Sequence, residues 1–228
     1  MWETQKAELR KDIRSRLKAM PEEEKRILDR EIAERVLGLP EIAETKAVYG
    51  YASLSWEAGT GEILEELRAQ KYIICLPKVT GETMEFFVTE SEQDLLEGSF
   101  HIMEPKNGCR KADETRSEIL RTAPILVPGM GFAETGARLG KGGGFYDRYL
   151  EQHDGHMTIA LAYEFQILGE IPVGPYDKNV DLIVTEKRVI RCKDRDAGTR
   201  IREEQPCEQK SDRKQRKLPM FSEKWGQI

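Results

Sequence analysis

Hydrophobic positions recur at helical spacing near the start of the chain. Leu9 and Ile13 are separated by charged residues, and this pattern predicts a helix over residues 6–16. A proline followed by three glutamates, beginning at Pro21, is typical of the start of a second helix, which we expect to end near Leu37. Two helices therefore open the fold.

Short apolar runs then alternate with segments of helical spacing. We expect strands over residues 47–51, 72–76, 84–88, 125–127, 158–162 and 182–185, and helices over 61–70, 92–97 and 145–153. Strands interleaved with helices predict an α/β fold, in which a mostly parallel sheet is covered by helices on both faces.

The composition changes after Cys192. From residue 193 onward, charged residues, glutamine and proline dominate with almost no apolar periodicity. We therefore expect one α/β domain over residues 1–192 and a charged, disordered tail over 193–228. A basic cluster at 210–217 is able to contact an acidic partner, but a solvated tail is the simpler interpretation.

Composition narrows the class of protein. The chain has 228 residues and a net charge of −5, so no general basic surface favours nucleic acid or an acidic membrane. Four cysteines without a C-x-x-C pair, and only three histidines, argue against structural zinc and against a secreted disulfide scaffold. No apolar run approaches the roughly 18 residues of a membrane span. We expect a soluble cytoplasmic protein, and the sequence leaves its oligomeric state open.

The most informative segment is residues 138–148, R-L-G-K-G-G-G-F-Y-D-R, which we call the glycine loop. Glycine lets successive N–H groups line one concavity, and the neighbouring cations supply countercharge for an anion. A helix beginning near Phe145 would add its positive end. Asp147 in its first turn is suited to holding Mg²⁺ beside a polyphosphate. The segment matches neither the Walker nor the dinucleotide motif, and it predicts a different phosphate site.

The glycine loop and the run before it carry a resemblance to a known family. Residues 125–132, I-L-V-P-G-M-G-F, and then 138–147 resemble the 5-formyltetrahydrofolate cyclo-ligases, also called methenyltetrahydrofolate synthetases. These enzymes carry a strand, P-G-x-x-F, and then R-L-G-x-G-x-G-[FY]-Y-D. The similarity extends over about residues 6–187. It implies an ATP- and Mg²⁺-dependent ligase that cyclises 5-formyltetrahydrofolate to 5,10-methenyltetrahydrofolate and releases ADP and phosphate.

The resemblance also implies roles for particular residues. The expected catalytic residues are Arg138, Lys141, Tyr146 and Arg148. The expected ATP contacts are Lys6, Arg10, Arg138, Leu139, Gly140, Lys141, Gly142, Gly143, Gly144, Phe145 and Tyr146. The expected contacts with the folate substrate are Ala52, Glu57, Met84, Phe86 and Tyr146. The expected magnesium ligands are Asp147 and Asp177.

Without the resemblance, several of these residues would have ordinary explanations. Lys6 and Arg10 share one helix face, where such a pair is usually solvated. Glu57 would be a loop glutamate before a helix that Thr60 is placed to cap. Met84 would be a core strand residue. Three positions depart from the family pattern, and these are Ala58, His101 in the motif over residues 98–105, and Tyr176 in place of a histidine.

Two other functions remain open from the residues alone. A sugar-phosphate isomerase or similar phosphate-ester enzyme would use the same glycine loop but would need a general base beside it. A nucleotide-sensing or RNA-associated protein would keep the loop and use the basic tail.

Overall fold

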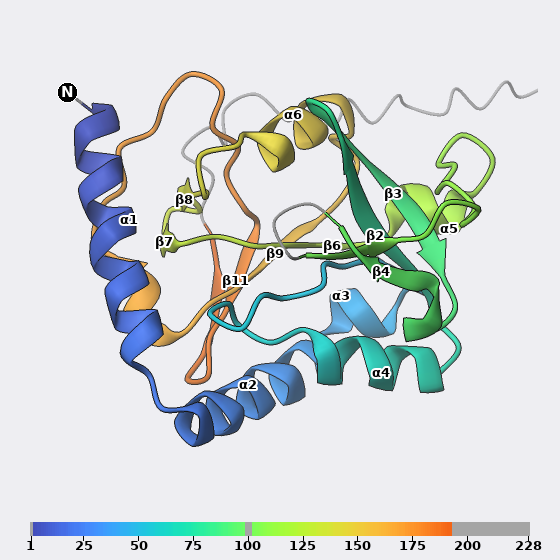
Figure 1. Ribbon diagram of the computed structural model, residues 1–228, viewed down its shortest axis with the longest axis horizontal. Coiled ribbons are helices and arrows are strands. Elements are labelled where there is room, and N and C mark those ends of the chain that lie inside the picture. Colours follow the sequence, from blue (N-terminus) through green and yellow to red (C-terminus); the bar gives the residue numbers. More distant parts are fainter. Residues whose placement is uncertain (1, 99–101, 193–228) are drawn as a thin grey trace, which may run out of the picture. The chain divides into compact units, whose positions relative to one another are not determined.

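The chain begins with long helices, as its hydrophobic spacing predicts. The computed structural model describes residues 2–98 and 102–192 (Figure 1). Expectations for the tail over 193–228, and for Phe100 and His101, lie outside these residues. The helices are α1 (Trp2–Ala19), α2 (Glu22–Leu37), α3 (Pro40–Ala43), α4 (Gly61–Ala69), α5 (Glu118–Thr122) and α6 (Phe145–Gln152). No helix in the described ranges is long and apolar enough to cross a membrane.

A seven-stranded sheet forms the centre of the domain. Its strands are β1 (Ala47–Tyr49), β2 (Ile73–Thr80), β3 (Thr83–Thr89), β6 (Ile125–Val127), β9 (Thr158–Leu161), β11 (Leu182–Val184) and β12 (Val189–Arg191). They lie in the order β12-β11-β9-β6-β1-β2-β3. The five inner strands are parallel, and the two edge strands, β3 and β12, are antiparallel to their neighbours. The predicted mostly parallel sheet is confirmed.

Two smaller sheets accompany it. The first joins β7 (Gly131–Ala133), β8 (Arg138–Leu139) and β10 (Ile167–Leu168), with β7 in the middle. The second pairs β4 (Leu95–Glu97) with β5 (Met103–Pro105). Because β7 and β8 follow β6 directly, they carry the chain from the carboxyl end of a central strand into the glycine loop.

Alternating side chains of the parallel strands fill two apolar cores. In β1, Val48 belongs to the core under α1, α2 and α4, whereas Tyr49 belongs to the core under α5 and α6. Figure 1 shows α2 and α4 below the sheet and α6 above it. Helices therefore cover both faces, as expected for a parallel sheet whose strands are buried throughout.

One local prediction was wrong, and one was right only in the position of the residue. Residues 92–97 do not form a helix. They begin with a single 3-10 turn, η1 (Glu92–Asp94), in which the Asp94 carboxylate accepts from the backbone N–H of Ser91 at 3.0 Å. The chain then continues as strand β4, which pairs with β5. Thr60 stands at the N-cap of α4, but its hydroxyl donates to the Tyr51 carbonyl and does not cap the helix. A second short 3-10 turn, η3 (Glu164–Gln166), precedes β10.

One carboxylate joins α2 to the loops at the carboxyl edge of the sheet. Asp29 Oδ1 accepts from the backbone N–H of Gly59 at 2.8 Å and from the hydroxyl of Tyr163 at 2.7 Å. Its other oxygen lies 2.5 Å from Lys25 Nζ. The Tyr163 hydroxyl also lies 3.3 Å from the carbonyl oxygen of Glu57, so this contact network fixes the loop that carries Glu57.

We predict that Asp29→Ala lowers the free energy of unfolding by about 1–3 kcal/mol, because the Gly59 and Tyr163 donors lose their acceptor. Urea denaturation followed by circular dichroism measures the change. The exposed Glu23, which pairs only with Arg26 on the surface of α2, supplies the control Glu23→Ala. Equal midpoints for the two variants would contradict the role given to Asp29.

Candidate functional site

The glycine loop leaves the small sheet at β8 and ends in α6. Gly142 has a φ of 107° and Gly144 a φ of 65°, values that side-chain-bearing residues rarely adopt. Gly144 is the N-cap of α6, whose first residue is Phe145. The free N–H groups and positive dipole of this helix start therefore face the same loop, as the sequence predicted.

Arg138 is the most buried cation of the loop. Its side chain is 4% exposed, and one guanidinium nitrogen lies 2.7 Å from Asp147 Oδ1. A second nitrogen donates to the Pro128 carbonyl at 3.2 Å. The sequence folds this way because Arg138 is a β8 residue paired with Phe132 of β7, which directs the guanidinium under the start of α6.

Helix α1 brings two further cations to the same place. Lys6 is buried, forms an ion pair with Asp177, and lies 4.7 Å from the centre of the Trp2 ring. Arg10 donates from Nε to the Gly140 carbonyl at 2.8 Å. Neither cation is the freely solvated residue that such spacing usually gives, since Arg10 contacts the glycine loop and Lys6 contacts Asp177. Their contact with a phosphate stays a prediction.

The two predicted magnesium ligands lie on adjoining segments. Asp147 Oδ1 accepts from the backbone N–H of Lys178 at 3.1 Å, and Lys178 follows Asp177 in the chain. Asp177 Oδ2 accepts from the backbone N–H of Gly174 at 2.7 Å. Both carboxylates are partly exposed, so each keeps an oxygen surface available to a cation. Tyr176, which replaces the family histidine, is 75% exposed.

A third ion pair lies on the loop after β1. Glu57 is buried and pairs with Lys141 of the glycine loop. Its other carboxylate oxygen accepts from the backbone N–H of Leu54 at 2.8 Å. Lys141 Nζ also lies 4.9 Å from the centre of the Trp56 ring. Glu57 is thus held beside the loop and is not the solvated glutamate that its loop position alone suggests.

Among the described residues, three buried polar atoms of this site lack a hydrogen-bond partner. One is Oε1 of Glu57, which meets Lys141 only as an ion pair, and the other two are donors. These donors are the hydroxyl of Tyr146 and Nε of Arg138. Burial raises the pKa of Tyr146 and the neighbouring Glu57 carboxylate raises it further, against the opposing effect of Arg138. Tyr146 therefore keeps its proton at neutral pH. Buried donors of this kind are costly unless a ligand accepts from them.

Other predicted residues lie elsewhere. Arg148 donates to the Glu82 carbonyl at 3.0 Å and stacks over Phe145 at 5.0 Å, so its guanidinium is directed to the β2–β3 turn. Met84 and Phe86 are buried in the core under α5 and α6. A cavity of about 1110 Å³ is bordered by Met84, Phe86, Phe145 and Arg148.

Sequence reasoning missed three contributors to the site. Trp2 and Trp56 each place a ring near a lysine of the site, and the backbone of Lys178 fixes Asp147. A tryptophan four residues before a lysine on a helix was a usable signal for Trp2. The other two contacts join segments far apart in the chain, and no local pattern indicates them.

Fold and site together define an α/β protein with a cation-rich glycine loop at the carboxyl edge of its sheet. The model of the 5-formyltetrahydrofolate cyclo-ligase family matches residues 3–186. The chain belongs to this family and is a ligase.

Relatives and a solved structure agree with this assignment. The 5-formyltetrahydrofolate cyclo-ligase of Mus musculus is 30% identical over 191 residues, which cover 78% of this chain and 92% of that protein. The enzyme of the same name from Escherichia coli K12 is 29% identical and covers 78% of this chain and 98% of its own length. The structure of Aquifex aeolicus 5,10-methenyltetrahydrofolate synthetase superposes with a TM-score of 0.72 at 33% identity, covering 83% of this chain and 93% of that one.

The geometry of the glycine loop leads to a prediction for Gly142→Ala. A Cβ at a φ of 107° strains the loop whatever space surrounds it, and a strain of about 1–3 kcal/mol should weaken Mg·ATP binding roughly tenfold. Isothermal titration calorimetry measures the affinity. Gly61→Ala is the matched control, since Gly61 has an ordinary φ and no neighbour within 4 Å of an added Cβ. An unchanged affinity for Gly142→Ala would show that the loop does not hold the triphosphate.

Proposed function

We propose that this chain catalyses the ATP-dependent cyclisation of 5-formyltetrahydrofolate to 5,10-methenyltetrahydrofolate, with release of ADP and phosphate. One observation supports this most directly. Arg138 and Lys141 belong to the glycine loop and Arg10 donates to its Gly140 carbonyl. A fourth cation, Lys6, pairs with Asp177, next in the chain to Lys178, whose backbone N–H binds Asp147 of the loop. Family membership connects this anion site to the ligase reaction.

The chemistry explains why a nucleotide is needed. The formyl oxygen is a poor leaving group, so closure of the ring by N10 stalls unless that oxygen is first phosphorylated. In the reaction, the formyl oxygen attacks the γ-phosphorus and ADP leaves. N10 then adds to the formyl carbon, and the carbon–oxygen bond breaks to release phosphate. Phosphoryl transfer of this kind depends chiefly on positioning and charge neutralisation.

The triphosphate is proposed to lie along the glycine loop. Backbone N–H groups between Leu139 and Tyr146 would line it, and the side chains of Lys6, Arg10 and Lys141 would neutralise it. The buried Arg138 Nε and the Tyr146 hydroxyl supply donors that a bound ligand would satisfy. Tyr146 belongs at the junction of nucleotide and folate, since it neighbours both Arg138 and Glu57.

Asp147 and Asp177 are proposed to hold Mg²⁺. Oxygen donors from carboxylates and phosphates are the ligands that this ion prefers, and the two acids lie on adjoining segments. The ion would supply charge neutralisation on the phosphates. The same carboxylates now pair with Arg138 and Lys6, so both cations become available to phosphate oxygens when the carboxylates turn to a metal.

Glu57 is proposed to recognise the folate. A buried carboxylate accepts two N–H bonds from a 2-amino-4-oxo pyrimidine edge. Ala52 lies half-buried earlier in the same loop. Met84 and Phe86 border the 1110 Å³ cavity, and their contact with substrate stays a prediction.

Arg148 and the location of the protein complete the proposal. Arg148 would have to leave the Glu82 carbonyl to reach a phosphate. A cytoplasmic location is in keeping with Cys75 and Cys109, which carry free thiols. The family assignment does not favour the isomerase or the RNA-associated alternative.

Ultraviolet absorbance tests the proposed reaction directly. Purified protein with 5-formyltetrahydrofolate and Mg·ATP should form the methenyl product in proportion to enzyme, and omission of ATP should abolish it. A rate equal to that without enzyme would refute the activity. Sugar-phosphate turnover that needs no folate would favour the isomerase instead.

Substitutions in the loop should slow this reaction. We expect Arg138→Ala to lower kcat by about 100-fold or more, as for loss of a preorganised charge-stabilising donor, and Asp147→Asn to raise the Mg²⁺ concentration needed for half-maximal rate. The exposed Glu23→Gln is the control, since Glu23 lies on α2 and pairs with Arg26 on the surface. Near wild-type rates for Arg138→Ala would show that the loop is misassigned.

A further inference from the structure

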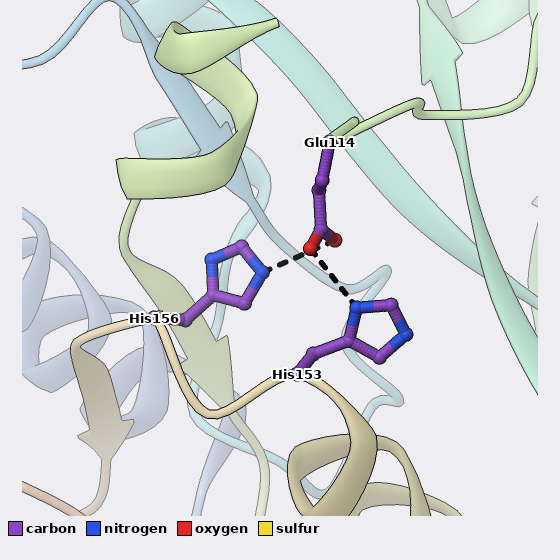
Figure 2. Close-up of side chains that lie close together, drawn as sticks. All are labelled: Glu114, His153 and His156. Carbon is purple, nitrogen blue, oxygen red and sulfur yellow. Dashed lines mark hydrogen bonds and ion pairs between the residues drawn. The ribbon is translucent and has the colours of Figure 1, made fainter. Parts of the chain in front are cut away.

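A second polar cluster lies at the other end of α6 from the glycine loop. Glu114 comes from the segment before α5, His153 is the C-cap residue of α6, and His156 precedes β9. We call these three residues the Glu/His cluster. Figure 2 shows both imidazole rings directing a nitrogen at the Glu114 carboxylate. One potential ligand atom from each side chain lies within 4.8 Å of the others.

His156 is the most buried residue of this cluster. Its side chain is 1% exposed. Nδ1 lies 2.7 Å from the Ala123 carbonyl oxygen. A carbonyl only accepts, so we assign the ring proton to Nδ1. In the neutral ring Nε2 then carries a lone pair, and it lies 3.2 Å from Glu114 Oε1 without hydrogen-bond geometry.

An unprotonated ring nitrogen 3.2 Å from a carboxylate oxygen in a largely buried place is stabilised by a positive charge between or beside the two atoms. That charge is either a second proton on His156 or a metal ion. The surroundings favour the ion, because they supply what a metal ligand set needs. His153 Nδ1 lies 2.9 Å from the other oxygen of Glu114, so a second imidazole faces the same carboxylate.

Glu114 is held as an anion. Burial raises the pKa of Glu114, but hydrogen bonds from His153 and Tyr149 act against it, and the pKa of Glu114 lies below its ordinary value. Oε1 accepts from the hydroxyl of Tyr149 at 2.9 Å and from that of Tyr49 at 3.2 Å. Hydrogen bonds of this kind orient ligating carboxylates in metal sites, as the Ala123 carbonyl would orient His156.

Two of the three residues also face open space. Glu114 and His153 border the 1110 Å³ cavity, together with Tyr149 and Gln152. A cation bound by the cluster would therefore keep a coordination position for water or a small ligand. Three protein ligands of the two-histidine, one-glutamate type, with one open position, are typical of Zn²⁺ sites that are not closed structural sites.

We propose that Glu114, His153 and His156 form a binding site for a divalent transition-metal ion of the Zn²⁺ class, open to the cavity beside α6. Ligand atoms of a tetrahedral zinc site lie about 3.3 Å apart, so binding would draw the three side chains together. The site is separate from the proposed magnesium carboxylates and does not rest on the proposed reaction. The low number of histidines argued against zinc from sequence, but the fold collects two of them around one glutamate.

A bound ion would act on α6. The ring of Tyr149 stacks on that of His153, with 4.1 Å between centroids and 9° between planes. A metal would thus tie the carboxyl end of this helix to the segment before α5, while its amino end carries Asp147. Because an ion that binds only the folded state stabilises it, Zn²⁺ should raise the melting temperature.

Zinc binding by the full chain tests the proposal. Metal-free protein is titrated with Zn²⁺ in excess Mg²⁺, which occupies oxygen-only sites such as Asp147 and Asp177, and bound zinc is counted after desalting. We expect one Zn²⁺ per chain for the wild type. Glu114→Gln and His153→Ala should each weaken binding by more than about tenfold, since the loss of even an outer hydrogen bond costs 10- to 100-fold. The control Glu118→Gln removes a nearby exposed carboxylate that pairs only with Arg121.

Several results would overturn the proposal. The first is that the wild-type protein binds no Zn²⁺ under these conditions. The positive charge beside Glu114 would then be a second proton on His156. The second is that Glu114→Gln and His153→Ala both bind Zn²⁺ as tightly as the control Glu118→Gln. His153 is 33% exposed, so its alanine variant should fold even if Glu114→Gln does not. The visible spectrum of the Co²⁺ form gives a second measurement on the wild type, because a strong thiolate charge-transfer band would place the metal on cysteine.

Discussion

The candidate site depends on opposite charges paired within a partly buried place. Lys6 with Asp177 and Lys141 with Glu57 each join a cation to a carboxylate from another segment, and Arg138 pairs with Asp147 across the glycine loop itself. A buried charge without a partner is strongly destabilising, so these pairs must form if the segments are to pack together. They hold the first helix, the glycine loop and the loop before β11 in one arrangement.

The same pairing prepares the site for an anion. Two unit charges 4 Å apart interact by about 4 kcal/mol at an effective dielectric constant of 20. A phosphate oxygen that replaces a carboxylate beside Lys6 or Arg138 therefore preserves most of this attraction, provided that a cation takes over the carboxylate. Magnesium and a polyphosphate arriving together satisfy both requirements, whereas either alone leaves a charge unpaired. In the proposed site, this ionic arrangement would favour the metal–nucleotide complex over free nucleotide.

The sequence predicted those parts of the fold that are determined locally. Hydrophobic residues at helical spacing around Ile13, separated by charged residues, predicted the first helix. Uninterrupted apolar runs predicted the parallel strands at 125–127 and 158–162. Strands of two or three residues, such as β8 and β10, have no periodicity to detect, because their pairing partners are distant in the chain. Residues 92–97 were misassigned because the hydrogen bond from the Ser91 N–H to the Asp94 carboxylate closes a single 3-10 turn of three residues.

Similar reasons apply to the sites. The glycine loop could be recognised because its chemistry is concentrated in eleven consecutive residues. The neighbouring ion pair between Lys6 and Asp177 spans 171 positions and follows only from the folded chain. The Glu/His cluster was missed for the same reason, since Glu114 and His153 are 39 positions apart. Sequence reasoning therefore singled out the glycine loop as a candidate phosphate site and not the partners that organise it.

The most direct test of this account is a crystal structure of the full chain with Mg²⁺ and a non-hydrolysable ATP analogue. The account predicts that the triphosphate lies on the glycine loop, that Lys6 and Arg138 contact its oxygens, and that Asp147 and Asp177 face the metal. A nucleotide bound elsewhere, with the Lys6–Asp177 and Arg138–Asp147 pairs intact, would contradict it.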